Sequence, residues 1–301
     1  MTPAETKLNV DRFLQNVRGT VATRLERVSS VLGDAVGSQD LLPGKMLRSR
    51  LGGRLTADGG LETAARSTWR TCAAVELVHT ASLCHDDVID NAFLRRARPS
   101  LWRTAGRSCA VLIGDLLLCE AMDIVLHTAE GRYAETFLQR VGEVCSAEAT
   151  QELQLRGSEL SEERCMKVAR GKTGPLFALV AEVAGGDDEV LCPALSEAGY
   201  RMGTAYQLAD DLVDVIGEEE EAGKTLGTDR RRNKHTLPQA ERGRSRAMKK
   251  IREICDGALD CLTAWPGVRR AVARYLLEDL QPVLRRFDPE LNAGTGLQDE
   301  V

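Results

Sequence analysis

The sequence predicts an all-α fold, built as one large domain of helices around a central cavity. Apolar residues recur at helical spacing along nearly the whole chain of 301 residues, and no convincing run alternates apolar and polar residues as a half-buried strand does. The prolines fall between the periodic segments or near their ends, where they interrupt a helix least. No linker, low-complexity tract or change of composition divides residues 1–301, so a single domain is expected.

The helices follow in order from the periodic runs and from the residues that interrupt them. Pro43 precedes the second run, Pro99 precedes the fourth, and Pro266 opens the last. Gly185 to Asp188 predict a turn. The expected helices cover residues 7–32, 45–57, 61–90, 104–128, 131–157, 161–184, 188–217, 238–263 and 266–285. Residues 294–301 are expected to form a frayed tail.

Composition excludes several classes of protein. A net charge of −5 does not suggest a nucleic-acid binder, and nine cysteines without a Cys-x-x-Cys pair favour reduced thiols over disulfides or a zinc site. The N-terminus lacks the apolar run of a secretory signal. The apolar stretch 110–126 is interrupted by Asp115, Glu120 and Asp123, which predicts a buried helix rather than a membrane span. The protein is therefore expected to be cytoplasmic and not an integral membrane protein.

Two aspartate clusters of the same form are the strongest functional signal. They comprise Asp86, Asp87 and Asp90, and then Asp210, Asp211 and Asp214. In each cluster the first and third carboxylates are four residues apart, on one helical face, where they repel one another. Mg²⁺ relieves such repulsion, because it prefers carboxylate oxygens and bridges them to phosphates. A solvated surface face is the alternative for one cluster alone, but the apolar flanks of both favour a cavity with metal-held phosphate.

Basic residues suited to phosphate accompany the clusters. They are Lys45, Arg48, Arg95, Arg96, Lys172, Lys224 and Lys234. Lys45 and Arg48 lie three residues apart at a helix start, where the helix dipole also favours anions. Arg95 and Arg96 follow the first cluster directly, and arginine binds phosphate oxygens in pairs. Each cation alone would indicate a solvated surface, but beside two metal-type clusters they indicate a diphosphate site.

At these residues the chain resembles the all-trans polyprenyl diphosphate synthases, from about Leu42 to Pro238 and more loosely to the C-terminus. The matching motifs are Gly44-Lys45-Met46-Leu47-Arg48, His79 with His85-Asp86-Asp87, Arg95-Arg96, Glu148 with Gln151, Lys172-Thr173, Gln207 with Asp210-Asp211, and Gly223 to Asp229. The resemblance implies the isoprenoid synthase fold and a head-to-tail prenyltransferase. Such an enzyme joins isopentenyl diphosphate to an allylic diphosphate (geranyl, farnesyl or longer), uses three Mg²⁺ ions and pairs as a homodimer.

The resemblance also implies a role for each matching residue. The diphosphate of isopentenyl diphosphate would be bound by Lys45, Arg48, His79 and Arg96. The Mg²⁺ ions would be held by Asp86, Asp87, Asp90, Asp210 and Asp214, with Asp211 supporting these ligands. The allylic substrate would be bound by Arg95, Lys172, Thr173, Gln207, Lys224 and Lys234.

Several residues depart from the family pattern. Pro43, Met46 and Ser49 stand where the family has Gly, Arg and Pro, Ala97 replaces a Gly, and Trp102 replaces a common His. Residues 230–234 lack the usual Glu-Gly-Lys. The sequence therefore assigns no role to the run from Arg230 to Arg232, and the departures leave the central chemistry in place.

Product length is expected to depend on the residues one turn before Asp86. Ala81 and Ser82 lie there, followed by Val78 and Ala74 further from the cluster. Short-chain members of the family carry a bulky aromatic at the Ala81 position, so the resemblance implies a medium to long product, and Ala81→Phe is expected to shorten it. Ordinary helix packing is the alternative reading of Ala81. The candidates for the floor of the channel are Leu117, Leu118 and Met122.

A class I terpene cyclase and a non-catalytic subunit of a two-component synthase are the alternative functions. A cyclase also uses an aspartate-rich helix and Mg²⁺, but it would not need Lys45, Arg48 and His79, and its second metal motif has Asn/Ser/Glu character. A partner subunit typically lacks the acidic clusters, and both are present here. Activity of the purified chain alone would separate these cases.

Overall fold

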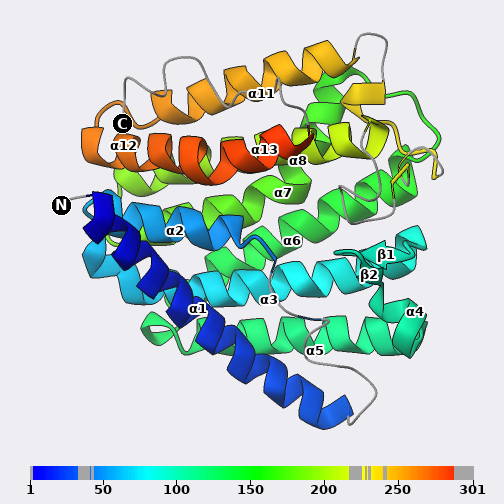
Figure 1. Cartoon of the computed structure of the whole chain (residues 1–301), viewed down its shortest axis with the longest axis horizontal. Helices are drawn as coiled ribbons and strands as arrows, with labels where there is room; N and C mark the ends of the chain where they lie inside the picture. The colour runs from blue at the N-terminus through cyan, green and yellow to red at the C-terminus, as the bar shows by residue number, and fades with distance from the viewer. Residues whose placement is uncertain are drawn as a thin grey trace.

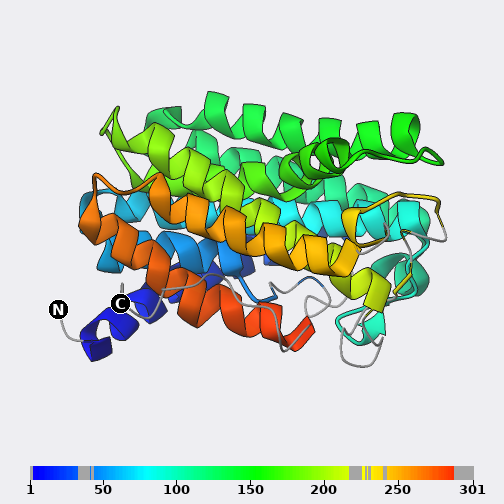
Figure 2. The same cartoon turned by 90° about the horizontal axis from the view of Figure 1, so that it is seen from above.

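The computed structural model describes residues 3–32, 41, 44–216, 226–227, 229, 232–239 and 243–287. In this part of the chain almost every element is a helix, which confirms the all-α prediction. The long helices lie side by side in layers, and the N-terminal helix crosses the others obliquely (Figure 1). The view from above shows the same stacking of long helices (Figure 2).

The elements follow the predicted order. The first half contains α1 (Pro3–Leu32), α2 (Leu47–Asp58), the 3-10 turn η3 (Glu62–Ala64), α3 (Ala65–Asp90), β1 (Leu94–Arg95), β2 (Arg98–Pro99), α4 (Leu101–Ala105), α5 (Arg107–Leu126) and the 3-10 turn η4 (Ala129–Gly131). The second half contains α6 (Ala134–Thr150), the π turn η5 (Gln151–Leu155), α7 (Glu162–Ala184), α8 (Leu191–Ile216), the 3-10 turn η6 (Leu237–Gln239), α11 (Gly243–Asp260), α12 (Pro266–Arg274), the π turn η7 (Tyr275–Leu280) and α13 (Gln281–Phe287). Helix α3 contacts α1, α2, α5 and α7, so it lies at the centre of the bundle.

Three of the predicted helices are interrupted in the structure. The predicted helix 104–128 is divided into α4 and α5 at Gly106, whose φ of 91° is incompatible with a helix. The predicted helix 131–157 ends in η5, and the predicted helix 266–285 contains η7. A π turn adds one residue to a helical turn and is common at functional sites. Apolar periodicity does not reveal such a local change, because the flanking turns keep the helical pattern.

Pro175 lies inside α7, so the expectation that prolines fall between helices or near their ends is wrong at this residue. A proline has no N–H to donate to the carbonyl four residues earlier, which here belongs to Gly171. Pro175 is buried among core residues, and this packing holds the helix together across the missing hydrogen bond. The residues directly before it, Lys172 and Thr173, line the cavity described below.

Helices α7 and α8 pack unusually closely through glycines. A Cβ atom placed on Gly203 would lie 2.7 Å from the Cα of Gly174, and one on Gly199 would lie 2.6 Å from the Cα of Ala178. A side chain at Gly199 or Gly203 would therefore push the helices apart. The close contact brings Thr173 of α7 within hydrogen-bonding distance of Gln207 of α8.

The buried apolar side chains form two clusters. One gathers residues of α2, α7, α8, α11 and α12, including Leu51, Leu208 and Val272. The other gathers residues of α1, α3 and α5, including Val17 and Leu117, together with further residues of α7. Helix α7 therefore contributes to both clusters, as a helix that is apolar on most of its surface does. Both clusters contribute residues to the lining of the cavity. Phe177 belongs to the first cluster and Val78 to the second.

The residues after α3 form a short antiparallel hairpin, so the expectation of no strand is wrong in this segment. Leu94 pairs with Pro99 and Arg95 with Arg98, which leaves Arg96 and Ala97 as the two turn residues. Both turn residues have positive φ, 52° and 59°. Two positive φ values define a type I′ turn, the usual connection of a two-residue hairpin. This turn explains why a glycine is common at the position of Ala97.

We expect Ala97→Gly to raise the free energy of unfolding by about 0.5 kcal/mol. The left-handed conformation costs alanine about 1 kcal/mol, and the greater freedom of glycine in the unfolded chain cancels part of the gain. Chemical denaturation measures the difference. Ala22→Gly, at an exposed position in the middle of α1, is the control and should lower the free energy of unfolding. Equal effects of the two substitutions would contradict a strained turn.

Candidate active site

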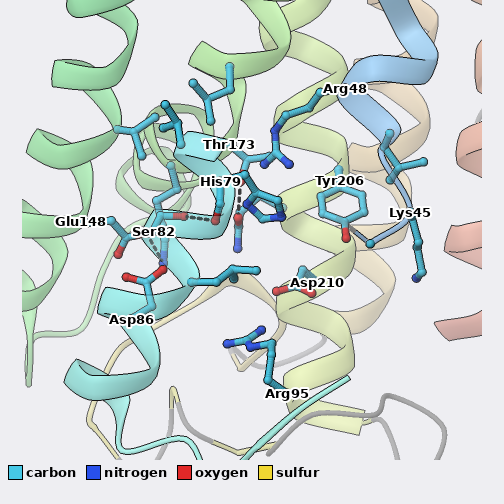
Figure 3. Close-up of a pocket in the computed structure, with 18 of the residues that line it drawn as sticks. Lys45, Arg48, His79, Ser82, Asp86, Arg95, Glu148, Thr173, Tyr206 and Asp210 are labelled. Atoms are coloured by element: carbon cyan, nitrogen blue, oxygen red, sulfur yellow. Dashed lines mark hydrogen bonds and ion pairs between the residues drawn. The ribbon is translucent and has the colours of Figure 1, made fainter. Parts of the chain in front are cut away.

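A cavity of about 520 Å³ lies between α2, α3, α6, α7 and α8. Most of the predicted site residues line it: Lys45, Arg48, His79, Ser82, Asp86, Asp90, Arg95, Arg96, Lys172, Thr173, Gln207, Asp210, Asp211, Asp214 and Lys234. Asp86 of α3 and Asp210 of α8 lie on opposite walls, while Arg48 and His79 lie deeper between them (Figure 3). Segments separated by more than a hundred residues therefore meet at one site.

The first aspartate cluster is placed by the last turn and a half of α3. Asp87 is almost completely buried and is not among the residues that line the cavity, because it points to Arg95, whose Nε donates to its Oδ1 at 3.1 Å. Asp90 accepts a hydrogen bond from Lys234 Nζ at 2.8 Å. The predicted cluster is therefore divided, with Asp86 and Asp90 facing the cavity and Asp87 holding an arginine at its edge.

The second cluster is held by a chain of hydrogen bonds between α7 and α8. The Thr173 hydroxyl donates to Gln207 Oε1 at 2.5 Å, and Gln207 Nε2 donates to Asp211 Oδ1 at 2.8 Å. Asp214 Oδ2 accepts from the backbone N–H of Asp229 at 3.2 Å. Gln207 is thereby fixed in one orientation, and one carboxylate oxygen of Asp211 is engaged by the Gln207 amide.

The acidic groups at the centre of the cavity are held in close mutual repulsion. Burial and the nearby Glu148 raise the pKa of Asp86 to about 7. Burial and Asp229 raise the pKa of Asp211 to about 7. The site thus contains more buried negative charge than its own cations compensate. Glu148 lies beside Asp86 on the same wall (Figure 3).

Lys172 supplies a positive charge to this acidic centre. Its Nζ lies 3.1 Å from Glu148 Oε1 and donates to Gln151 Oε1 at 3.0 Å. Burial lowers the pKa of Lys172, but the nearby Glu148, Asp229 and Asp211 outweigh burial and raise this pKa above its ordinary value. Lys172 therefore stays protonated at neutral pH and can bind an anion.

Arg48, at the other end of the cavity, is incompletely hydrogen-bonded. Arg48 is buried, its guanidinium stacks on Phe177 at 5.2 Å from the ring centre, and its Nε makes no hydrogen bond to the described residues. Burial, Arg48 and Arg96 together keep the pKa of His79 well below its ordinary value, so the imidazole is neutral. An anion such as a diphosphate would complete the hydrogen bonds of this pocket.

Glu76 is a cavity residue that the sequence analysis did not single out. It lies fully buried on α3, where Ser49 Oγ donates to its Oε1 at 2.6 Å. Burial raises the pKa of Glu76, while Ser49 and Arg48 oppose that effect. One feature of the sequence could have identified Glu76: it is a glutamate within an apolar run. A charge in such a run needs a partner in the fold.

The residues expected to set product length do not all reach the cavity. Ser82 and Val78 line it, whereas Ala81 and Ala74 are completely buried in the apolar cluster on the other side of α3. Five residues correspond to a rotation of about 140° around a helix, so Ala81 cannot share the face of Asp86. The proposed floor residues Leu117, Leu118 and Met122 do not line the described cavity either. Lys224 and most of the run from Gly223 to Asp229 lie outside the described residues.

A divalent cation such as Mg²⁺ needs several oxygen donors around one point. No group of three or more His, Cys, Asp or Glu side chains closes around one point in the described part of the chain. The reason is visible at two aspartates, since Asp87 contacts Arg95 and Asp90 contacts Lys234. The donor set nevertheless fits a hard cation, because the cavity offers carboxylate oxygens that carry excess negative charge.

The fold and the site together define the isoprenoid synthase class: an all-α bundle with two aspartate-rich helix ends facing one cation-lined cavity. The family described as "Polyprenyl synthetase" matches residues 34–260. The chain belongs to this family.

Known relatives support this assignment along the chain. The nonaprenyl diphosphate synthase of Mycobacterium tuberculosis is 33% identical over 300 residues, which cover 90% of this chain and 88% of that protein. The octaprenyl diphosphate synthase of Escherichia coli is 32% identical over 169 residues, covering 55% of this chain and 52% of that protein.

Solved structures agree with the fold. A polyprenyl synthase from Caulobacter crescentus, crystallised with calcium and isoprenyl diphosphate, matches with a TM-score of 0.67 and 25% identity, covering 95% of this chain and 96% of that one. A geranyltranstransferase from Thermotoga maritima matches with a TM-score of 0.66 and 28% identity, covering 87% and 96%. Among the described residues no helix combines the length and the apolar character that crossing a membrane requires.

Proposed function

We propose that this protein is a head-to-tail prenyltransferase that condenses isopentenyl diphosphate with an allylic diphosphate to give an all-trans polyprenyl diphosphate of medium to long chain. The observation that carries the proposal is the pairing of two acidic walls, at Asp86 and Asp210, with the separate cation pocket at Arg48. Two diphosphates can therefore be bound in one cavity. The nonaprenyl and octaprenyl synthases among the relatives support the class of product.

The acidic residues fit Mg²⁺ as the counter-charge of the allylic diphosphate. We propose that three ions are held by Asp86, Asp87, Asp90, Asp210 and Asp214. When bound, Mg²⁺ would neutralise the negative charge of the leaving diphosphate. Asp87 would have to release Arg95 for this, since the two side chains are paired. Asp211 would keep Gln207 in place through the hydrogen bond described above.

The cations of the chain divide between the two substrates. We assign Lys45, Arg48, His79 and Arg96 to isopentenyl diphosphate, and Arg95, Lys172, Lys224 and Lys234 to the allylic diphosphate. A neutral His79 can donate one hydrogen bond to a phosphate oxygen without adding charge to a pocket that already contains Arg48. Lys172, which stays charged, stabilises the diphosphate as its C–O bond to the allylic carbon breaks.

The carbon chemistry needs shielding rather than a protein nucleophile. The allylic C–O bond breaks to a carbocation, the isopentenyl double bond forms the new C–C bond, and a proton then leaves to the released diphosphate. Leu83, Val144 and Leu176 provide an apolar wall beside the aspartates, where water cannot easily reach the cation. The terpene cyclase alternative does not use the Arg48 pocket, and a non-catalytic subunit does not need either acidic wall.

We also propose that the protein is a homodimer. Helix α5 exposes a row of large apolar side chains at Val111, Leu112, Met122 and Leu126, and α6 exposes Leu138. An exposed apolar surface of this kind is typical of a subunit interface. Sedimentation of the purified protein would show a dimer, and a monomer at micromolar concentration would contradict the proposal.

The function is tested by product analysis. The purified chain is incubated with isopentenyl diphosphate, Mg²⁺ and either geranyl or farnesyl diphosphate, and the products are measured by mass. We expect a series of polyprenyl diphosphates that continues beyond fifteen carbons. A cyclic hydrocarbon would instead identify a cyclase, and no product from the chain alone would identify a non-catalytic subunit.

We expect Ser82→Phe to shorten the products by several isoprene units. Ser82 lines the cavity one turn before Asp86, and one turn of about 5.4 Å corresponds to roughly one isoprene unit. Ala81→Phe is the comparison, since Ala81 is buried in the apolar cluster and overpacking there costs about 1–3 kcal/mol of stability. Product analysis and thermal unfolding separate the two. A product series that Ser82→Phe leaves unchanged would show that Ser82 is not part of the channel.

A further inference from the structure

Arg232 reaches from the segment after Asp229 to α3 and η5, beside the part of the cavity that Asp90 lines. Its Nε lies 3.2 Å from Asp90 Oδ1 on α3, and its guanidinium also forms an ion pair with Glu152 of η5. It donates a further hydrogen bond to the backbone carbonyl of Ile89. The side chain is only 14% exposed. An arginine held from three sides is part of a built arrangement rather than a solvated surface cation.

The segment that carries Arg232 is fixed to η5 by its backbone. The N–H of Gly157 donates to the carbonyl of Asn233 at 2.7 Å, and Arg156 Nε donates to the carbonyl of Arg232 at 2.9 Å. The next residue, Lys234, is 5% exposed and also contacts Asp90, at 2.8 Å. Residues 232–234 are therefore held beside the cavity as long as these contacts persist.

The charge around Asp90 differs from the charge around Asp86, although both line the same cavity. Asp90 faces two cations, Arg232 and Lys234, and Glu152 shares them. Asp86 faces Glu148, and together with burial this raises its pKa to about 7. Asp90 therefore has direct cation partners, whereas Lys172 and Lys234 act on Asp86 only from a greater distance.

We propose that Arg232 is a latch that holds Asp90 in the empty enzyme and must release it before a divalent cation binds to that carboxylate. The proposal rests on the proposed function, in which Asp90 is a metal ligand. A guanidinium remains charged at every physiological pH, so the latch opens by cation competition and not by titration. Binding of a metal to Asp90 is then coupled to release of residues 232–234, and Arg232 is a positioning residue rather than a catalytic one.

The first test compares Arg232→Gln with Arg24→Gln. Arg24 is the matched control, because its side chain is also 14% exposed and forms an ion pair with Glu120 at 2.6 Å, away from the cavity. A titration with Mn²⁺ in the absence of substrate, followed by calorimetry, measures the metal affinity of each protein. We expect Arg232→Gln to bind Mn²⁺ about fivefold more tightly than the wild type, the effect of losing one partly buried ion pair, and Arg24→Gln to bind within about twofold of the wild type.

Two further measurements separate a latch from a general change of charge. In an Asp90→Asn background, Arg232→Gln should no longer change the Mn²⁺ affinity, because the competition passes through Asp90. Limited proteolysis should cleave the wild-type chain at residues 232–234 faster when Mn²⁺ is present. The Arg232→Gln protein should be cleaved there rapidly with or without the metal, while its thermal unfolding midpoint stays close to that of the wild type.

Each outcome decides the proposal. Equal Mn²⁺ affinity in wild type and Arg232→Gln, the same gain in Arg24→Gln, or a gain that persists without the Asp90 carboxylate would overturn it. It also fails if neither protein binds Mn²⁺ without substrate, since no empty-site binding would then exist for Arg232 to oppose. The proposed function is contradicted by a different result, namely that the protein makes no polyprenyl diphosphate. That result can occur even when the Mn²⁺ titrations support the latch.

Discussion

Replacement of Asp86 by asparagine is expected to lower kcat for the condensation by about a thousandfold. Asp86 lines the cavity opposite Asp210, and it is the one acid of the first cluster that forms no direct ion pair with a cation among the described residues. Removal of one charged group that stabilises the leaving diphosphate, through its metal, has an effect of this order. Steady-state kinetics with farnesyl diphosphate, isopentenyl diphosphate and saturating Mg²⁺ measures the loss.

The same substitution should leave the protein folded. Burial and Glu148 raise the pKa of Asp86 to about 7, so the folded chain already disfavours its charged form. Asn removes that charge with little change in shape, and the thermal unfolding midpoint should stay the same or rise. Glu163→Gln is the control, because Glu163 is exposed on the first turn of α7, far along the chain from either cluster. A midpoint that falls by several degrees, with activity lost in proportion, would assign Asp86 to stability instead.

The second large effect is expected at Arg48. We predict that Arg48→Leu raises the KM for isopentenyl diphosphate about a hundredfold, because a guanidinium forms one or two charge-assisted hydrogen bonds to a diphosphate. The loss of stability should be small, and smaller than at Arg54. Arg48 Nε has no hydrogen-bond partner among the described residues, and the buried Glu76 near Arg48 keeps its hydrogen bond from Ser49. Kinetics and chemical denaturation measure the two quantities.

Arg54, on the same helix α2, supplies the matched control. Its Nε donates to Asp279 at 2.8 Å and its Nη2 to Glu278 at 2.6 Å, so its charge is fully compensated within the fold. Arg54→Leu leaves Asp279 buried without this partner and should lower the free energy of unfolding by about 3–5 kcal/mol. The KM of the protein that remains folded should be unchanged. If both substitutions changed stability alike, or neither changed the KM, the assignment of Arg48 to substrate would be wrong.

The sequence by itself was sufficient for the fold class and for the acidic clusters. Helical periodicity is a local property, and the spacing of Asp86 and Asp90, or of Asp210 and Asp214, places each pair on one face of a helix wherever that helix lies. Helical geometry also separates Ala81 from the face that carries Asp86. Five residues before Asp86 lies the opposite side of α3, and the structure places Ala81 in the apolar cluster there.

Only the tertiary structure decided which charges meet. Asp87 pairs with Arg95 eight residues later, and Arg232 meets Asp90 and Glu152 from distant parts of the chain. No local pattern encodes these contacts, because they depend on how α3, η5 and the segment after α8 are packed together. The positions of Glu76 and of the π turn η5 have the same origin. The sequence thus determined which chemical groups the site contains. Packing determined which of them are paired and which remain available to substrate, because the interaction between two charges depends on their distance in space.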